Sequence, residues 1–444
     1  MTVRPSALAL TPLLLFLALF FGAGLYFTAQ GEPMGFYQLR APVAILPALA
    51  LAVWLAHRKG LAAGDILLRG MGDPDIVLMC LIFLLAGAFA YVSSAIGAVD
   101  AVVSIGLSVI PVSMVLPGLF VLAALIALAI GSSMGTIAAV IPIALGVADA
   151  SDLDTALVVG AVIGGAMFGD NLSVISDTTI AATRTQGAQM RDKFRENLKF
   201  ALPASIVTVV VLALSGGSAP VEVGATDSPW LVLPYAVVLA MALAGVDVRV
   251  VLGTGIVLAG GFGIVFAEDY GVVPFVGDVW SGFEGMVEIL LLSLLIGGLG
   301  ALTKASGGLD WLAQRIAGFA RGRRGPRAGE LSIAALSTAA DVFTANNTVA
   351  ILVSGSIARD IAEKHGVSPR RAASMLDIFA CIAQGVLPYG AQILLAASLA
   401  SVSPLALAGS VYYCWILGLV TLGMLLWPRG RCARPSATTP TPRA

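Results

Sequence analysis

The stretch GDNLSVISDTTIAATRTQG, residues Gly169–Gly187, follows Thr155–Phe168 (TALVVGAVIGGAMF), a segment as apolar as the inside of a membrane helix. It carries two carboxylates, Asp170 and Asp177, among hydroxyl and amide side chains. Of the 444 residues, 58% are hydrophobic and only 11% are charged, whereas a soluble domain has about a quarter charged residues. The composition therefore indicates a membrane protein, in which such a polar interruption needs a physical reason.

Apolar runs of about 20 residues, long enough to cross a bilayer, recur from end to end. The first run, after Arg4, is too long for the core of a signal peptide, so we expect it to remain as the first helix. We predict an all-α polytopic membrane protein with about ten spanning helices. These are expected near residues 7–28, 42–56, 74–95, 156–183, 198–216, 229–246, 248–267, 286–304, 374–400 and 405–427.

Two further apolar stretches, residues 118–148 and 329–358, are interrupted by polar tips. The tips are GSSMGT (Gly131–Thr136) and ADVFTANNT (Ala340–Thr348). Each limb would have about 14 residues, or roughly 21 Å of helix, against a hydrocarbon core of about 30 Å. Short limbs favour two re-entrant hairpins, while a pair of full helices at each place would give the same topology.

The charge of the loops predicts the orientation of the chain, because Lys and Arg are retained on the cytoplasmic side. Acidic residues without Lys or Arg lie in the loops 217–229 and 268–285, which are expected outside. Both termini are expected to be cytoplasmic, and the loop 184–199 is expected to be a solvated inner face. The basic segments, all expected inside, are 57–60, 184–199, 321–327, 368–371 and the tail after Trp427.

The sequence contains a weak internal repeat at an offset of 210 residues, where AIGAVD (Ala95–Asp100) resembles ASGGLD (Ala305–Asp310). Both interrupted stretches fall in this register, and each is followed by a helix with a polar break, FGDNLS and QGVLPYGAQ (Gln384–Gln392). Loop charge gives the two units opposite orientations, which is the inverted-topology repeat of many secondary transporters. The predicted parts are an N-terminal helix pair (1–73), transport repeat 1 (74–216), connecting helices (217–285), transport repeat 2 (286–427) and a disordered cytoplasmic tail (428–444).

Four polar interruptions in membrane segments have a shared explanation. Non-helical backbone at membrane depth is stable only where it is buried in protein or lines a wet cavity, so the four are expected to meet near the midplane. Hydroxyl, amide and carboxylate oxygens suit a hard cation such as Na⁺. Removing a carboxyl group from water disfavours its charged form, so it can hold a proton and release it to a cation. Na⁺ and H⁺ would then exchange by competition.

The predicted ion or substrate site takes polar side chains from all four interruptions, and Asp170, beside a glycine cluster, is expected to carry the exchanged proton. The Na⁺ ligands are expected to be Asp170, Asp177, Asn346 and Asn347. Helix capping is the structural alternative for Asp177, Asp341 and the Asn346–Thr348 segment, and hydrogen bonding to helical carbonyls is the alternative for the hydroxyls of the first tip. The predicted site residues are Asp170, Asn171, Ser173, Ser176, Asp177, Thr178, Ser132, Ser133, Thr136, Asp341, Asn346, Asn347, Thr348 and Gln384.

At these residues the sequence resembles the NhaC-type sodium/proton antiporter family, within the larger ion-transporter superfamily. The motifs GSSMGT, FGDNLSVISDTTIAATRTQG, ANNTVAI and QGVLPYGAQ carry the resemblance, which extends from about Pro74 to Trp427. It implies one transporter domain of two inverted repeats, a homodimer, and a bacterial inner membrane. Some relatives move organic acids or amino acids with Na⁺ or H⁺. The resemblance also implies an ion or substrate site at Asp170, Ser173, Ser176, Asp177, Thr178, Asn346, Asn347 and Thr348.

The predicted function is exchange of Na⁺ for H⁺, with the lipid bilayer as surroundings, no cofactor and no nucleic-acid partner. The alternative is Na⁺- or H⁺-coupled transport of a small organic solute, an amino acid or a carboxylate, on the same scaffold. A basic residue in the site would favour a carboxylate cargo, and none lies among the interruptions. An enzyme is not expected, because GSSMG matches G-x-S-x-G but neither His57 nor His365 lies in a membrane segment to act as base.

Overall fold

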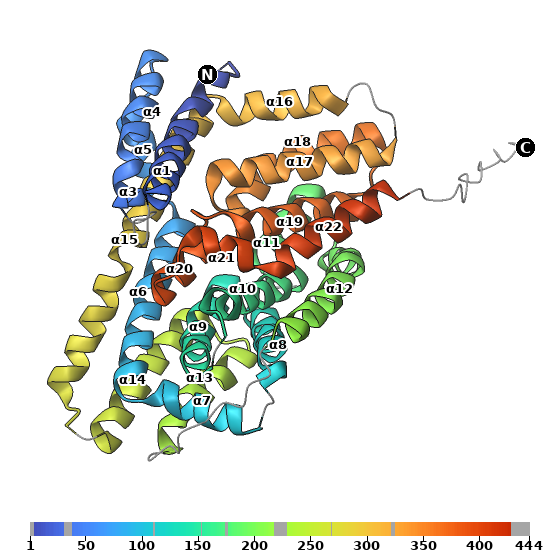
Figure 1. Ribbon diagram of the computed structural model, residues 1–444. Coiled ribbons are helices and arrows are strands. Elements are labelled where there is room, and N and C mark those ends of the chain that lie inside the picture. The colour runs from blue at the N-terminus through green and yellow to red at the C-terminus, as the bar shows by residue number, and fades with distance from the viewer. Residues whose placement is uncertain are drawn as a thin grey trace, which may run out of the picture.

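The computed structural model describes residues 4–30, 38–109, 112–151, 153–173, 176–216, 229–267, 269–320 and 325–427. Every regular element in these residues is a helix, which confirms the predicted all-α fold (Figure 1). The predicted disordered tail, 428–444, and nearly all of the predicted acidic loop 217–229 lie outside the described residues.

The helices follow one another with short connections along most of the chain. Those before the middle of the chain are η1 (Ala7–Leu10), α1 (Thr11–Ala29), α3 (Ala41–Ala44), α4 (Leu46–Arg58), α5 (Ala63–Met71), α6 (Pro74–Ala95), α7 (Ala98–Val109), α8 (Val112–Ile130), α9 (Ser133–Asp149), α10 (Thr155–Leu172), α11 (Asp177–Gln186) and α12 (Met190–Ser215). The later ones are η2 (Pro229–Val232), α13 (Leu233–Leu243), α14 (Val248–Phe266), α15 (Val272–Ala305), α16 (Gly308–Ala320), α17 (Pro326–Thr344), α18 (Asn347–His365), α19 (Pro369–Val386), α20 (Ala391–Ala400), α21 (Pro404–Ser410) and α22 (Tyr412–Leu426).

The protein is a multi-pass membrane protein with slightly fewer spans than the ten expected. Eight helical segments of the described chain are long and apolar enough to cross a membrane, or nine if α21 and α22, bent by 50°, form one span. The expected span not counted among these is 229–246, where η2 and α13 are shorter than the other spans.

The segment 268–285, which was predicted to be an outer loop, is helical over most of its length, so the prediction of a loop was wrong there. Residues from Val272 onward belong to α15, which has 34 residues and is therefore about 51 Å long. Its acidic positions are single polar residues within a helix, and one of them, Asp278, accepts a hydrogen bond from the Tyr270 hydroxyl at 2.8 Å. The acidic residues alone had indicated a loop. A carboxylate on this helix can instead be stabilised by a neighbouring hydrogen-bond donor, as Asp278 is by Tyr270.

Four helix pairs are separated by short breaks, after Ile130, Leu172, Thr344 and Val386, and all four fall in the interruptions that the sequence predicted. The two sets of four helices repeat one spacing. Helices α8 to α11 begin at positions 112, 133, 155 and 177, and α17 to α20 begin at positions 326, 347, 369 and 391. The predicted register of 210 holds for α7 and α16 but not beyond them, because four additional residues precede α17.

The limbs on either side of the first and third breaks are longer than the sequence predicted. Helices α8, α17 and α18 have 19 residues each and α9 has 17, so each limb is about 26–29 Å long. The prediction was short because these helices continue into their polar flanks, as α18 does through Lys364 and His365. Helices α17 and α18 lie side by side along their length (Figure 1).

Local chemistry sets the backbone at the two predicted tips. Gly131 has a left-handed φ of 74°, which glycine adopts at little cost, and the Ser132 side chain then caps α9. Ala345 has a left-handed φ of 50° without being glycine, which costs roughly 1–2 kcal/mol, and Asn346 caps α18. Each tip therefore ends one helix and starts the next within two residues.

Helix α10, near the centre of Figure 1, begins the most deeply buried candidate span, since 94% of the most apolar window in the α10–α11 segment is inside the protein. It packs closely on α8 through glycines. A Cβ atom at Gly165 would collide with the carbonyl oxygen of Phe120, and one at Gly169 with that of Ala124. These glycines let the two backbones touch, as small residues do in membrane helix packing. The polar end of α10 is thereby held deep in the protein.

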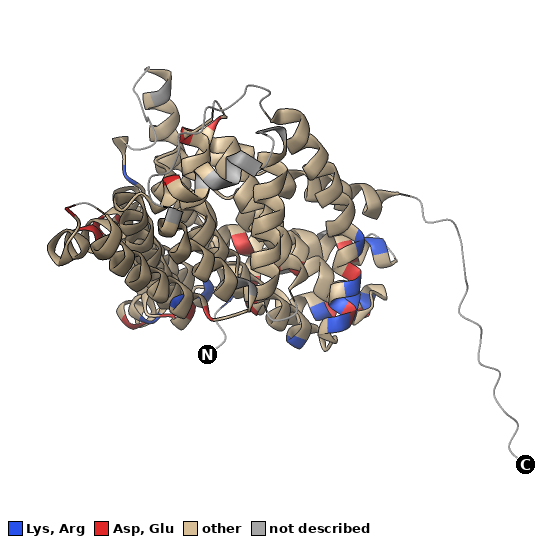
Figure 2. Ribbon diagram, turned by 90° about the horizontal axis from the view of Figure 1, so that it is seen from below, with Lys and Arg blue, Asp and Glu red and all other residues tan. Residues whose placement is uncertain are grey.

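The predicted solvated loop 184–199 is a helix from Met190 onward, and only one face of that helix is solvated. Helix α12 begins there, and three polar side chains of its first turns, those of Lys193, Glu196 and Asn197, are buried. Figure 2 shows a group of Lys and Arg together with acidic residues at one side of a ribbon that is mainly uncharged. Charges near the start of α12 thus belong to packed contacts between helices as well as to a solvated face.

Candidate functional site

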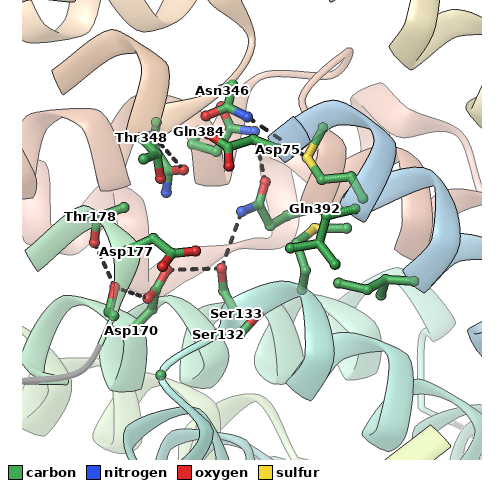
Figure 3. A pocket seen from close by; sticks show the side chains of 17 residues that line it. Asp75, Ser132, Ser133, Asp170, Asp177, Thr178, Asn346, Thr348, Gln384 and Gln392 are labelled. Atoms are coloured by element: carbon green, nitrogen blue, oxygen red, sulfur yellow. Dashed lines mark hydrogen bonds between the residues drawn. The ribbon is translucent and has the colours of Figure 1, made fainter. Parts of the chain in front are cut away.

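A polar cavity of about 80 Å³ lies where the four breaks meet (Figure 3). That volume has room for a few water molecules or a partly hydrated ion. Its lining comes from the starts of α6, α9, α11, α18 and α20 and from the ends of α10 and α19. The residues that line it are Asp75, Leu78, Met79, Ile82, Gly131, Ser132, Ser133, Met134, Asp170, Ser176, Asp177, Thr178, Asn346, Asn347, Thr348, Gln384 and Gln392.

Asp170 is the most buried carboxylate of this cavity, with 6% of the residue exposed. Its side chain accepts hydrogen bonds from the hydroxyl groups of Ser133, at 3.0 Å, and Ser176, at 2.6 Å. The Ser176 hydroxyl also lies 2.8 Å from that of Thr178. The ion pairs of the described residues do not include Asp170. Hydroxyl groups therefore donate hydrogen bonds to this carboxylate, but no ion pair of the described residues balances its charge.

A chain of hydrogen bonds joins Asp170 to the later breaks (Figure 3). The Gln392 side-chain amide donates to the Ser133 hydroxyl at 3.1 Å, and the Gln384 amide donates to the Gln392 oxygen at 2.7 Å. The Gln384 amide also donates to the carbonyl oxygen of Ala345 at 3.2 Å. Three side chains, those of Ser133, Gln392 and Gln384, therefore connect Asp170 to the break between α17 and α18 by hydrogen bonds.

The tip that begins α18 forms the opposite wall of the cavity. Asn346 caps the helix by accepting from the Val349 N–H at 3.0 Å, and the Asn347 side-chain oxygen accepts from the Thr348 N–H at 3.0 Å. The capping alternative is therefore correct for Asn346. Both amides still line the cavity, so capping and contact with an ion are compatible.

Two more carboxylates line the same cavity. Asp177, at the start of α11, is exposed, and Asp75, at the start of α6, is partly buried. Among the described residues, no side chain caps the start of α11. Sequence reasoning missed Asp75 because it follows Asp73 and Pro74, where an acid is expected to stabilise a helix N-terminus. It missed Gln392 as a site residue, although this glutamine ends the predicted break.

Four predicted site residues do not line the cavity. Thr136 donates to the carbonyl oxygen of Ser132 at 3.0 Å, which is the back-bonding alternative, and Ser173 donates to that of Leu128 at 3.2 Å. The Asn171 side chain accepts from Asn197 at 2.6 Å. Asp341 is fully buried in α17, and neither of its carboxylate oxygens has a hydrogen-bond partner among the described residues.

The side chains that line the cavity favour a small cation. They include three carboxylates together with hydroxyl and amide groups, and no Lys, Arg or His is among these described residues. Oxygen ligands of this kind suit a hard cation. A carboxylate shielded from water can bind either that cation or a proton.

One family and one known protein match the chain over most of its length, and two further proteins match parts of it. A family described as the Na⁺/H⁺ antiporter family matches residues 41–217 and 220–427. The Na⁺/H⁺ antiporter NhaC of Bacillus subtilis is 23% identical over 374 residues, which cover 76% of this chain and 79% of that protein. NhaC of Alkalihalophilus pseudofirmus is 38% identical over 69 residues, 16% of this chain and 15% of that protein. The malate-2H⁺/Na⁺-lactate antiporter of B. subtilis is 23% identical over 184 residues, 41% of this chain and 39% of that protein.

Proposed function

Because this chain belongs to the Na⁺/H⁺ antiporter family, of the NhaC type, we propose that it exchanges Na⁺ for H⁺ across the membrane by competition of the two ions for Asp170. The observation that supports this most directly is a buried carboxylate held by the hydroxyls of Ser133 and Ser176. A carboxyl group buried in this way is stabilised either by a bound proton, which makes it neutral, or by a bound Na⁺, which balances the charge of its ionised form.

The residues around Asp170 have separate roles in this proposal. With a proton on Asp170 the carboxyl group is neutral, and the hydroxyls around it can donate or accept. When the proton leaves, Ser133 and Ser176 donate to the carboxylate, and Na⁺ binds beside it. Oxygens of Asp177, Asn346 and Asn347, on the other walls of the cavity, complete the Na⁺ ligands. One site that takes either ion but not both couples their movements in opposite directions.

We propose that the two units of four helices, α8 to α11 and α17 to α20, are the ion-binding parts of inverted transport repeats over 74–216 and 286–427. Their breaks recur with the same spacing and line one cavity, which supports this division. In this arrangement α8–α9 and α17–α18 are the re-entrant hairpins. Their limbs, at about 26–29 Å, do not exceed the hydrocarbon core. The segments 1–73 and 217–285 then lie outside the repeats.

The proposed exchange can be measured in proteoliposomes that contain the purified protein and a pH-sensitive dye. External NaCl is expected to raise the internal pH, because each Na⁺ that enters releases protons to the outside, and choline chloride is expected to leave it unchanged. Protein-free liposomes serve as the control. If malate, lactate or an amino acid moves the internal pH while Na⁺ alone does not, the organic-solute alternative is correct instead.

We propose that both termini and the segments 187–199 and 366–371 face the cytoplasm, while the start of α15 faces outside, as the Lys and Arg distribution favours. This orientation requires that the short segment of η2 and α13 crosses the membrane as well as the nine longer spans. Single cysteines at the exposed positions Gln189, Ser368 and Val273 test this in a variant without native cysteines. An impermeant thiol reagent added to intact cells is expected to label only the cysteine at 273. Labelling at 189 or 368 from outside would contradict the orientation.

A further inference from the structure

A buried ion pair lies next to the cavity, in a region where the sequence predicted a solvated loop. The Lys193 ammonium of α12 contacts the Asp377 carboxylate of α19 at 2.7 Å, and their side chains are 0% and 1% exposed. Neither residue lines the cavity. Burying both charges is costly unless the geometry is good and further hydrogen bonds are made, so the contacts around the pair are informative.

Lys193 of this pair makes hydrogen bonds on both sides of the break that follows Asp170. The Lys193 ammonium donates to the backbone oxygen of Asn171 at 2.9 Å and to the Thr179 hydroxyl at 2.6 Å. Asn171 is the residue after Asp170 in α10, and Thr179 lies in the first turn of α11. The Thr179 hydroxyl donates in turn to the backbone oxygen of Ser173, at 2.7 Å, inside the break.

Asn197, one helical turn after Lys193, doubles these contacts. Its side-chain amide lies 2.9 Å from the backbone oxygen of Asn171, 2.6 Å from the Asn171 side-chain oxygen and 2.7 Å from Asp377. Helix α12 is thus hydrogen-bonded to the end of α10 and, through Asp377, is linked to α19. These contacts therefore connect the break after Asp170 to α19, the helix that carries Gln384.

The charges of the pair also act on Asp170. Lys193 and Asp377 are both near enough to interact electrostatically with the Asp170 carboxylate, with opposite signs. Two further titratable side chains interact with Asp377, those of Cys381 of α19 and Tyr413 of α22, and both belong to types that are uncharged at neutral pH. The lysine therefore balances Asp377, and the charge of Asp170 is left for an ion to balance.

We infer that Lys193, Asn197 and Asp377 are positioning residues for ion binding at Asp170: they hold the break in place and keep the charge beside the site balanced. This rests on the proposed function, since it concerns the Na⁺ affinity of the same site. Loss of either charged partner should change Na⁺ affinity through the charge that remains, and removal of both should restore it.

Asp377→Asn leaves the Lys193 ammonium without its partner. The remaining positive charge is expected to repel Na⁺ and to raise the KM for Na⁺ by about tenfold. The charge-neutral double variant Lys193→Met with Asp377→Asn is expected to return the KM to within about twofold of the original value, even if Vmax stays low. Asn197→Leu changes no charge, so it is expected to lower Vmax and leave the KM nearly unchanged.

Lys199→Met is the matched control, because Lys199 lies on the same helix and pairs with Glu196 at 2.7 Å but is 57% exposed. It is expected to change neither constant. An unchanged KM in Asp377→Asn, or a KM in the double variant as high as in Asp377→Asn, would overturn the inference. Thermal unfolding of each purified variant in NaCl and in choline chloride reports Na⁺ binding without exchange. If the original protein neither exchanges nor is stabilised by Na⁺, the proposed function fails rather than this inference.

Discussion

Asp170→Asn is expected to reduce Na⁺/H⁺ exchange to background, a loss of about 100-fold or more, which is typical when a proton-carrying side chain is removed. The asparagine keeps the size of the side chain and can still interact with Ser133 and Ser176. It cannot be ionised, so it can neither release a proton nor balance the charge of Na⁺. Folding and membrane insertion should be unaffected, since a buried carboxylate is replaced by a neutral group.

The measurement is the initial rate of internal pH change after an NaCl pulse in proteoliposomes, at matched protein content. Asp154→Asn is the matched control, because Asp154 caps the start of the same helix at 2.9 Å from the Leu157 N–H and is exposed. Asparagine is an equally good cap, so this variant should exchange normally. If Asp170→Asn retains exchange with the original pH dependence, Asp170 does not carry the proton, and Asp177 becomes the first candidate.

Arg371→Met is expected to lower the free energy of unfolding by about 3–5 kcal/mol. Arg371 of α19 is only 8% exposed; it contacts Glu330 of α17 at 3.0 Å and Glu196 of α12 at 3.5 Å, and its guanidinium lies 4.4 Å from the ring centroid of Phe200. Both glutamates are buried as well. Removing the arginine takes away the cation that contacts both buried glutamates, and loss of one partner is the costly half of breaking a buried ion pair.

The loss can be measured from the unfolding of the purified protein in detergent. Arg359→Met is the control, since Arg359 pairs with Glu363 at 3.4 Å but both side chains are more than half exposed. Such a surface pair contributes about 1 kcal/mol or less. The double variant Arg371→Met with Glu330→Met should recover much of the lost stability. Equal stability of Arg371→Met and Arg359→Met would show that the buried network contributes nothing.

Much of the candidate site could be predicted because its residues interrupt apolar segments. Asp170, Ser133 and Asn346 each lie at a break in a run of hydrophobic residues, and the structure brings all three to one cavity. A polar break at membrane depth needs a wet or packed neighbourhood, and this requirement can be deduced from the chain alone. The same reasoning included Asp341 and Thr136, because a break predicts where polar side chains occur and not which way each one points.

The sequence by itself determined the helical membrane fold and the places of its four breaks, since both follow from the length of apolar runs and the chemistry of helix ends. Only the tertiary structure decided which charges are buried. Lys193 and Asp377 lie in different halves of the chain, each near a basic loop, where a charged residue is normally solvated. Their burial depends on α10, α12 and α19 meeting at one point. Burial is a property of the neighbours that surround a side chain, and the order of residues along one helix does not record them.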